Sequence, residues 1–476
     1  MSSRLQLGSA FRRWGTGLRK SEDHAKGAGG SALLPEAGEL RRLLDDAILA
    51  SGVPGAALSV VVDGTAVNAT AGVRSVDEYF PLLESARFEC LGLTRLAVAG
   101  VVHKLADAGT LGLDDPIERW LPELAGREAG EGISVAHLLS HTSGYLGENP
   151  ANLDKLFHYP WDEFVAFFGS TPQAYEPGTT FGVVESEYAM IGEAVRRAAG
   201  DDALNLAGEM LLKGLSPATG DDDPGAAGGN VPGHTFMPFE GGFAVVDPAP
   251  PCGFWAPSLL APAMTTELMA RLAELLLVRP GSLGCRPALA KRLVPLPAQM
   301  RGVRCAETPG SFGLGCGEFA PGVFGLSSEG MGQCNAVRAV PDRGVSLAVA
   351  LHCHAPRLRD KIAADALALV ADVEPVPTAD RIELDRPAEE FEGVYRAAHW
   401  QTLRVTLDGD RLHVANGYNP WLPVDQAAVG ATLDILDPRT CAFAEGSEDW
   451  SLGFFSHPNT GTPCLMVGLS AFARME

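Results

Sequence analysis

Basic residues are scarce in this chain, and their scarcity excludes two classes of partner. The 476 residues include 37 lysines and arginines against 59 aspartates and glutamates, so the formal net charge is −22. A surface this acidic repels phosphate backbones and anionic lipid headgroups. No apolar run is long enough to cross a bilayer. We therefore expect neither a nucleic-acid partner nor a membrane partner.

Cysteines are also few, nine in all, and no two are spaced as Cys-x-x-Cys. The absence of that spacing argues against a zinc ribbon and against a thioredoxin-like redox motif. Scattered, odd-numbered cysteines in a long chain are typical of a reduced compartment. The N-terminus is basic, but no apolar segment of the kind found in export signals follows it. These features predict a cytoplasmic protein.

The chain lacks the sequence patterns of acyl-serine hydrolases. No lysine has a serine three positions before it, so Ser-x-x-Lys does not occur. Tyr-x-Asn, Ser-x-Asn, His-x-Gly and Lys-Ser/Thr-Gly are absent, and no Gly-x-Ser-x-Gly elbow is present. Because a serine nucleophile needs a positioned base to take its proton, these absences argue against the usual serine chemistry.

What is present is a globular composition, with 46% hydrophobic and 20% charged residues, in a chain long enough for a large domain and a smaller one. Turn residues and apolar spacing place the early elements. We expect a helix at 34–51 before Gly52, a hairpin of 56–62 and 66–71 around Asp63-Gly64, and an apolar helix at 91–108 before Gly109.

The second half of the chain changes character. A buried strand at 345–353 and a helix at 355–372 are followed by a proline-containing linker at 376–384, and then by short alternating strands. Residues 1–30 are polar and predicted to be a disordered tail. The stretch 213–253 is rich in Gly, Pro and Asp, so it is either a lid over the site or a disordered insertion.

Several segments together resemble the β-lactamase-related serine hydrolases, which include class C β-lactamases, penicillin-binding proteins, D-aminopeptidases and esterases. The segments are VPGAALSVVVDG at 53–64, LADAGTLGLDDPIERWLPEL at 105–124, ISVAHLLSHTSGY at 133–145, PGTTF at 177–181, EYAMIG at 187–192, EFEGVYR at 390–396 and AFARM at 471–475. The resemblance implies an α+β domain at 31–375, with an antiparallel sheet flanked by helices and an all-helical region. It also implies a C-terminal lipocalin-like β-barrel at 385–476.

The resemblance further implies where the catalytic groups of the family would lie. Its nucleophilic serine corresponds to Gly92 and its lysine to Arg95. Its Tyr-x-Asn element falls on Val183 and Glu185, and its third element on Ser328-Glu329-Gly330. Glycine carries no nucleophile, and arginine does not give up its proton in a protein. The loss of three elements together predicts that the acyl-serine mechanism has been abandoned.

The residues now at these positions allow another chemistry. Arg95 is predicted to clamp a substrate carboxylate, with Glu185 or Glu329 moving protons as the general acid or base. Such a site supports cyclisation, isomerisation, elimination or water-mediated hydrolysis without an acyl-enzyme. The alternative is a salt-bridge network that stabilises an inactive pocket. We expect the side chains that bind the substrate to be Thr94, Tyr145, Ser328 and His354.

Other residues suggest weaker alternatives. Cys353 beside a histidine is a candidate for a displaced nucleophile. His352 and His354 alternate along the predicted strand, as two metal ligands could, but no third ligand is identifiable. His137 and His141 are interpreted as structural. We therefore predict no metal and no other cofactor.

Three functions remain open on the sequence. The favoured one is a repurposed enzyme that acts on a small carboxylate- or amide-containing substrate, for example in a biosynthetic pathway. The second is a pseudoenzyme that binds a ligand or a protein partner. The third is a hydrolase with a displaced nucleophile.

Overall fold

In the computed structural model of the chain, the described residues are 32–127, 129–145, 160–169, 173–201, 206, 230–237, 242–246, 263–279, 294–295, 309–330, 332–374, 381–396, 402–416, 430–444, 452–457, 459–467 and 470–475. None of the helices in these ranges has the length and apolar character needed to cross a bilayer. The predicted tail at 1–30 lies outside them, as does much of 213–253. The described part of that stretch includes a hairpin of β3 (Gly233–Met237) and β4 (Gly242–Val246).

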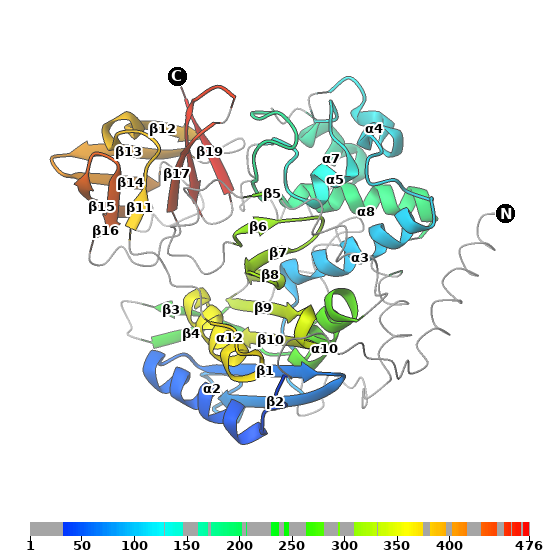
Figure 1. Ribbon diagram of the computed structural model, residues 1–476, viewed down its shortest axis with the longest axis vertical. Coiled ribbons are helices and arrows are strands. Elements are labelled where there is room, and N and C mark those ends of the chain that lie inside the picture. The colour runs from blue at the N-terminus through cyan, green and yellow to red at the C-terminus, as the bar shows by residue number, and fades with distance from the viewer. Residues whose placement is uncertain are drawn as a thin grey trace.

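An eight-stranded antiparallel sheet lies at the centre of the fold (Figure 1). Its strand order, β2-β1-β10-β9-β8-β7-β6-β5, places the first hairpin beside a strand that comes much later in the chain. The strands are β1 (Gly55–Val62), β2 (Thr65–Gly72), β5 (Val294–Pro295), β6 (Ser311–Phe312), β7 (Gly317–Ala320), β8 (Val323–Gly330), β9 (Gln333–Val340) and β10 (Val345–Leu351).

The hairpin prediction is confirmed, and its turn explains the register. Val62 pairs with Thr65, which leaves Asp63 and Gly64 as the two turn residues. Both have positive φ, at 47° and 82°. A two-residue hairpin turn needs this left-handed backbone, which aspartate tolerates and glycine adopts without strain.

Helices cover both faces of the sheet. On one face, α2 (Ala37–Ser51) and α12 (Pro356–Ala371) contact each other and bury leucine and isoleucine side chains against β1, β9 and β10. On the other face, α10 (Thr266–Ala273) packs on β1 and β10 and continues into a π-helical turn at Glu274–Val278. The predicted helices at 34–51 and 355–372 are confirmed.

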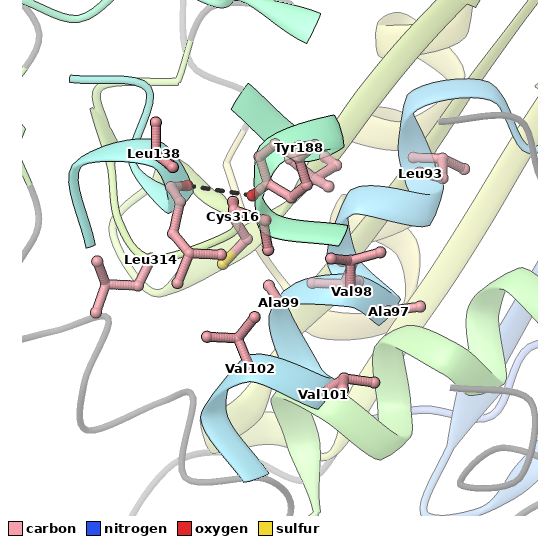
Figure 2. Close-up of a cluster of buried hydrophobic side chains, with 14 of the residues drawn as sticks. Leu93, Ala97, Val98, Ala99, Val101, Val102, Leu138, Tyr188, Leu314 and Cys316 are labelled. Carbon is pink, nitrogen blue, oxygen red and sulfur yellow. Dashed lines mark hydrogen bonds between the residues drawn. The ribbon is translucent and has the colours of Figure 1, made fainter. Parts of the chain in front are cut away.

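An all-helical region adjoins the second face. It contains α3 (Thr94–Asp107), α4 (Ile117–Trp120), α5 (Val135–Leu139), α7 (Trp161–Phe168) and α8 (Glu185–Ala199), with 3-10 turns at Leu91–Leu93 (η1) and Pro122–Leu124. Figure 2 shows Val98 and Val102 of α3 with Tyr188 of α8, whose hydroxyl donates to the carbonyl of Leu139 at 3.2 Å. The helix predicted at 91–108 therefore begins three residues later, after η1.

The C-terminal strands form a second antiparallel sheet of nine strands, in the order β11-β16-β15-β14-β13-β12-β19-β18-β17. It is nearly closed, because side chains of Asp385 and Arg386, just after β11, bond Ser456 of β17. A 3-10 turn at Ala388–Phe391 precedes β12. The strands are β11 (Arg381–Glu383), β12 (Gly393–Arg396), β13 (Thr402–Asp408), β14 (Arg411–Asn416), β15 (Gly430–Asp437), β16 (Thr440–Phe443), β17 (Leu452–Ser456), β18 (Pro463–Val467) and β19 (Ser470–Arg474).

These two sheets confirm the predicted fold class, an α+β domain followed by an all-β barrel-like unit. Two further predicted boundaries are wrong. Residues 381–383, placed in the linker, form β11 and pair with β16. The strand predicted at 345–353 ends at Leu351, and the three residues after it form a bend. His352 is buried and His354 is exposed, so the two histidines do not share one face as residues two apart in a strand would.

The nine-stranded sheet packs against the helical region through the loop that leads to α8. The ring of Tyr175 stacks on His457 with centroids 4.9 Å apart, and its hydroxyl donates to Cys464 Sγ at 3.5 Å. Asn459 Nδ2 donates to Glu176 Oε2 at 2.9 Å. Contacts with the C-terminal sheet therefore hold the loop before Glu185 in place.

Candidate functional site

The residue at the expected serine position lies in η1, one turn before α3. The backbone N–H of Gly92 donates to Ser328 Oγ on β8 at 2.6 Å. Glu89, three residues earlier, is also fixed to the sheet, because its backbone N–H donates to Gln333 Oε1 and its backbone carbonyl accepts from Asn335 Nδ2. Strands β8 and β9 thus hold the segment that enters α3.

Arg95 fills the space next to Gly92. A Cβ placed on Gly92 would lie 2.2 Å from Arg95 Nη2, far inside van der Waals contact. Arg95 Nε donates to the carbonyl of Gly92 at 3.2 Å, and its Nη1 lies 3.4 Å from His141 Nε2. The guanidinium therefore lies where the side chain of a serine at position 92 would begin.

Glu185 is the partner of Arg95 on the side of the site that reaches solvent. It is the first residue of α8, where a carboxylate is favoured by the unpaired N–H groups and the dipole of the helix. Its Oε1 lies 3.1 Å from Arg95 Nη2. The Arg95 side chain is 11% exposed and that of Glu185 is 26% exposed, so a small ligand could reach both.

A buried pair lies on the other side of Arg95. The imidazole of His141 contacts Glu187 Oε2 through Nδ1, and the hydroxyl of Ser143 donates to Glu187 Oε1. Both side chains of the His141–Glu187 pair are fully buried. Burial, and secondarily the positive charge of Arg95, hold the pKa of His141 well below its usual range. The imidazole is therefore neutral at physiological pH.

Glu329 does not join this cluster. Neighbouring residues of a strand point to opposite faces of the sheet. Ser328 faces Gly92, whereas Glu329 lies 3.2 Å from His354 Nδ1 and 3.5 Å from the buried Nη1 of Arg359 on α12. His354 is 65% exposed on this other side. Two of the predicted site residues, Glu329 and His354, thus contact each other but not Arg95.

The remaining predicted side chains lie in or near the core. Thr94 is buried at the first position of α3, adjacent to Arg95 in sequence. Tyr145 is 2% exposed; its hydroxyl donates to the carbonyl of Ala129, and its ring packs edge-on against Phe168. Burial raises the pKa of Tyr145 well above its usual range. The tyrosine therefore acts as a neutral, satisfied core residue.

The segment His352-Cys353-His354 does not form a second reactive centre. Burial raises the pKa of the Cys353 thiol to about 12, which keeps it protonated and poorly nucleophilic at neutral pH. His352 is fully buried and its Nδ1 lies 2.9 Å from His234 Nδ1, while His354 points to solvent. Among the described residues, no group of three His, Cys, Asp or Glu side chains could hold a metal ion.

The sequence interpretation treats His137 and His141 as structural and does not anticipate the contact between His141 and Glu187. Helix α5 ends at Leu139, and His141 lies beyond it with φ of 55°. His137 bonds the N-terminus of α5 instead, through Nδ1 and the N–H of Ser134. The only signal for Glu187 in the sequence is the Glu-x-Glu spacing at the start of α8.

Taken together, the site holds a cation, a solvent-reaching carboxylate and a buried imidazole–carboxylate pair. It can bind an anionic group through Arg95 and exchange a proton through Glu185. It offers no hydroxyl at position 92, and the N–H that would stabilise an oxyanion there is already bonded to Ser328.

Sequence comparison identifies one family model and several relatives. A profile of the family described as Beta-lactamase matches residues 40–372. Penicillin-binding protein 4 of Amycolatopsis lactamdurans is 30% identical over 161 residues, 32% of this chain and 41% of that protein. Esterase EstB of Burkholderia gladioli is 31% identical over 139 residues, 25% of this chain and 34% of that protein. The chain thus aligns with less than half the length of these curated relatives.

Solved structures agree with this fold. The crystal structure of SurE superposes with a TM-score of 0.66 at 22% identity, covering 92% of this chain and 99% of that one. The octameric penicillin-binding protein homologue from Pyrococcus abyssi gives a TM-score of 0.59 at 19% identity, covering 92% of this chain and all of that one. At these identities the likeness concerns the fold alone.

Proposed function

Because this chain belongs to the β-lactamase family, we propose that it is a repurposed member that binds a small carboxylate-containing ligand and carries out acid–base chemistry on it without an acyl-enzyme. Arg95 binds the ligand carboxylate, and Glu185 takes a proton from the ligand or gives one to it. The ligand is a small compound that carries a carboxylate.

One observation carries this proposal. The guanidinium of Arg95 fills the space that a side chain at position 92, where we expect the family's serine, would need, and its partner Glu185 is exposed enough to meet a ligand. Arginine presents a planar fork of donors that matches a carboxylate, which a lysine does not. An arriving carboxylate would share or replace the contact with Glu185. That exchange would free the Glu185 carboxylate to act as a base beside the bound ligand.

The second candidate is a pseudoenzyme that binds without turnover. It is favoured by the internal satisfaction of the site: Gly92 N–H is bonded to Ser328, and Arg95 is held by Gly92, His141 and Glu185. A site already paired in this way can be a stabilising network. The two candidates differ in turnover, so the same ligand experiment separates them.

Binding is tested with D-leucine and D-leucinamide, because a SurE structure with D-Leu is among the similar folds. These two probes differ only in the carboxylate. We expect D-leucine to bind more tightly by calorimetry, and Arg95→Ala to abolish the difference. Arg271→Ala removes a comparably exposed ion pair with Glu267 on α10 and serves as the matched control. Equal affinity for acid and amide in the wild-type protein would refute the proposal.

Turnover is tested on N-acetyl-D-leucine, which carries both a carboxylate and an amide, by mass spectrometry. Conversion by the wild type and its loss in Glu185→Gln would support the enzyme. Binding of D-leucine with N-acetyl-D-leucine left unchanged would favour the pseudoenzyme.

We also propose that residues 31–375 form one domain and that the nine-stranded sheet, which begins at β11, forms a second. We further propose that this second domain is a lipocalin-like barrel and that the protein is cytoplasmic. The C-terminal sheet contacts the loop before Glu185, and these contacts support a role for the barrel in shaping access to the site.

A further inference from the structure

The contact between Arg95 and His141 indicates which nitrogen of the imidazole carries the proton. Arg95 Nη1 lies 3.4 Å from His141 Nε2. An arginine nitrogen only donates hydrogen bonds, so Nε2 must present its lone pair to Arg95. In a neutral imidazole the proton then lies on Nδ1, which faces Glu187 Oε2. The second oxygen of Glu187 accepts from Ser143.

Because His141 and Glu187 are buried, their polar atoms need hydrogen-bond partners within the protein. The side chains of His141 and Glu187 are fully buried. The imidazole is enclosed by the rings of Tyr188, Phe312 and Phe181, whose centroids lie 5.3, 5.4 and 6.1 Å away. A carboxylate removed from water is strongly destabilised unless donors surround it. Glu187 therefore requires the N–H of His141 as well as the hydroxyl of Ser143.

The two carboxylates of α8 have different environments. Glu185, at the first position of the helix, pairs with Arg95 at the solvent side. Glu187, at the third, contacts the imidazole of His141, whose other nitrogen faces Arg95. Arg95 is thus held between two partners. Glu185 is partly exposed and can be displaced by a ligand, whereas the buried pair of His141 and Glu187 cannot be reached by a ligand.

We propose that His141 and Glu187 are positioning residues for Arg95. Glu187 fixes His141 as the Nδ1–H tautomer, and the lone pair of His141 Nε2 keeps the guanidinium beside Gly92 and directed at Glu185. The inference deepens the proposed function and rests on it for the ligand, but the tautomer and the contact with Arg95 are properties of the protein alone.

The first test is nitrogen-15 NMR of histidine-labelled protein at neutral pH. The signal of His141 is identified by its loss in His141→Gln, or by its loss in His141→Asn if the first variant does not fold. We expect a neutral imidazole with the proton on Nδ1. A neutral Nε2–H tautomer, or an imidazolium, would overturn the proposal whether or not any ligand binds.

The second test asks whether His141 senses Arg95. In Arg95→Lys the Nε2 resonance of His141 should move, because its donor changes. In Arg271→Lys, a matched change at a remote ion pair, it should stay in place. An Nε2 resonance that is unaffected by Arg95→Lys would show that the two side chains are not bonded, and would contradict the positioning role.

The third test measures the consequence for binding. We expect Glu187→Gln to weaken the binding of D-leucine more than that of D-leucinamide, so that the ratio of the two affinities changes by about tenfold. Circular dichroism should show that the variant is still folded. A purely structural pair would lower the Tm and leave the ratio of affinities unchanged, which would refute the positioning role. Failure of D-leucine to bind at all would count against the proposed function, while the NMR result would still decide the tautomer.

Discussion

Arg95 Nη2 lies 2.2 Å from the point where a Cβ on Gly92 would stand. Glycine at 92 and arginine at 95 are therefore complementary: the absence of a side chain at one position makes room for the guanidinium at the other. A serine could return to position 92 only if Arg95 moved. The residue at position 92 and the side chain at position 95 are therefore expected to depend on each other rather than to vary independently.

Restoring the serine should destabilise the protein. We expect Gly92→Ser to cost about 1–3 kcal/mol of unfolding free energy, because the new side chain overlaps Arg95. Gly92→Ser combined with Arg95→Lys should recover part of that loss, since lysine lacks the planar fork. Urea unfolding of both variants measures the effect. Equal stability of Gly92→Ser and wild type would show that Arg95 does not occupy the serine volume.

Removing the Ser328 hydroxyl should also destabilise the fold. Ser328→Ala leaves the N–H of Gly92 without its acceptor, at a cost of about 1–3 kcal/mol. Ser346→Ala is the matched control, because its buried hydroxyl donates to the carbonyl of Ala270, which already accepts the N–H of Glu274. We expect the control to lose less, and a loss as large as that of Ser328→Ala would contradict this account.

Acid should destabilise the protein through His352. Burial, and then the nearby His234, lower the pKa of His352 from its usual 6.5 to about 3. The folded state therefore binds fewer protons than the unfolded one, so this stabilisation is complete above about pH 6.5 and is lost as the pH falls toward 3.

Urea unfolding between about pH 7 and about pH 5 should show this loss in the wild type. His352→Asn should have a shallower pH dependence over the same interval. His141, whose pKa is also lowered, contributes with the same sign in both proteins. A wild-type stability that rises on acidification would contradict the assignment.

The native protein should expose few thiols. Of its nine cysteines, six are described and all six are buried, among them Cys353. We expect Ellman's reagent to titrate no more than three thiols before unfolding, and peptide mapping to find Cys353 unmodified. Rapid modification of Cys353 would revive the displaced-nucleophile hypothesis.

Local signals in the sequence sufficed for much of the fold. The Asp63-Gly64 turn and Gly52 after α2 are backbone requirements that the residues themselves reveal. The contact between Gly92 and Arg95 is likewise local, because the two residues are three apart, across η1 and the start of α3. By contrast, the strand end at Leu351 depended on His352 turning inward to His234, a contact between segments far apart in the chain.

The site itself was only partly predictable. Ser328 and Glu329 are adjacent in sequence, but the pleat of β8 sends them to opposite faces, so only Ser328 meets Gly92. His141 and Glu187 become neighbours of Arg95 through the packing of α3 and α8 with the loop after α5. No spacing rule within one element brings them together.

The most direct test of the central claim is the intact mass of the protein after incubation with a fluorophosphonate and, separately, with a β-lactam. With Arg95 in place of the serine side chain and the N–H of Gly92 bonded to Ser328, we predict no adduct with either reagent. A stoichiometric adduct would contradict the account, and the modified peptide would identify the nucleophile.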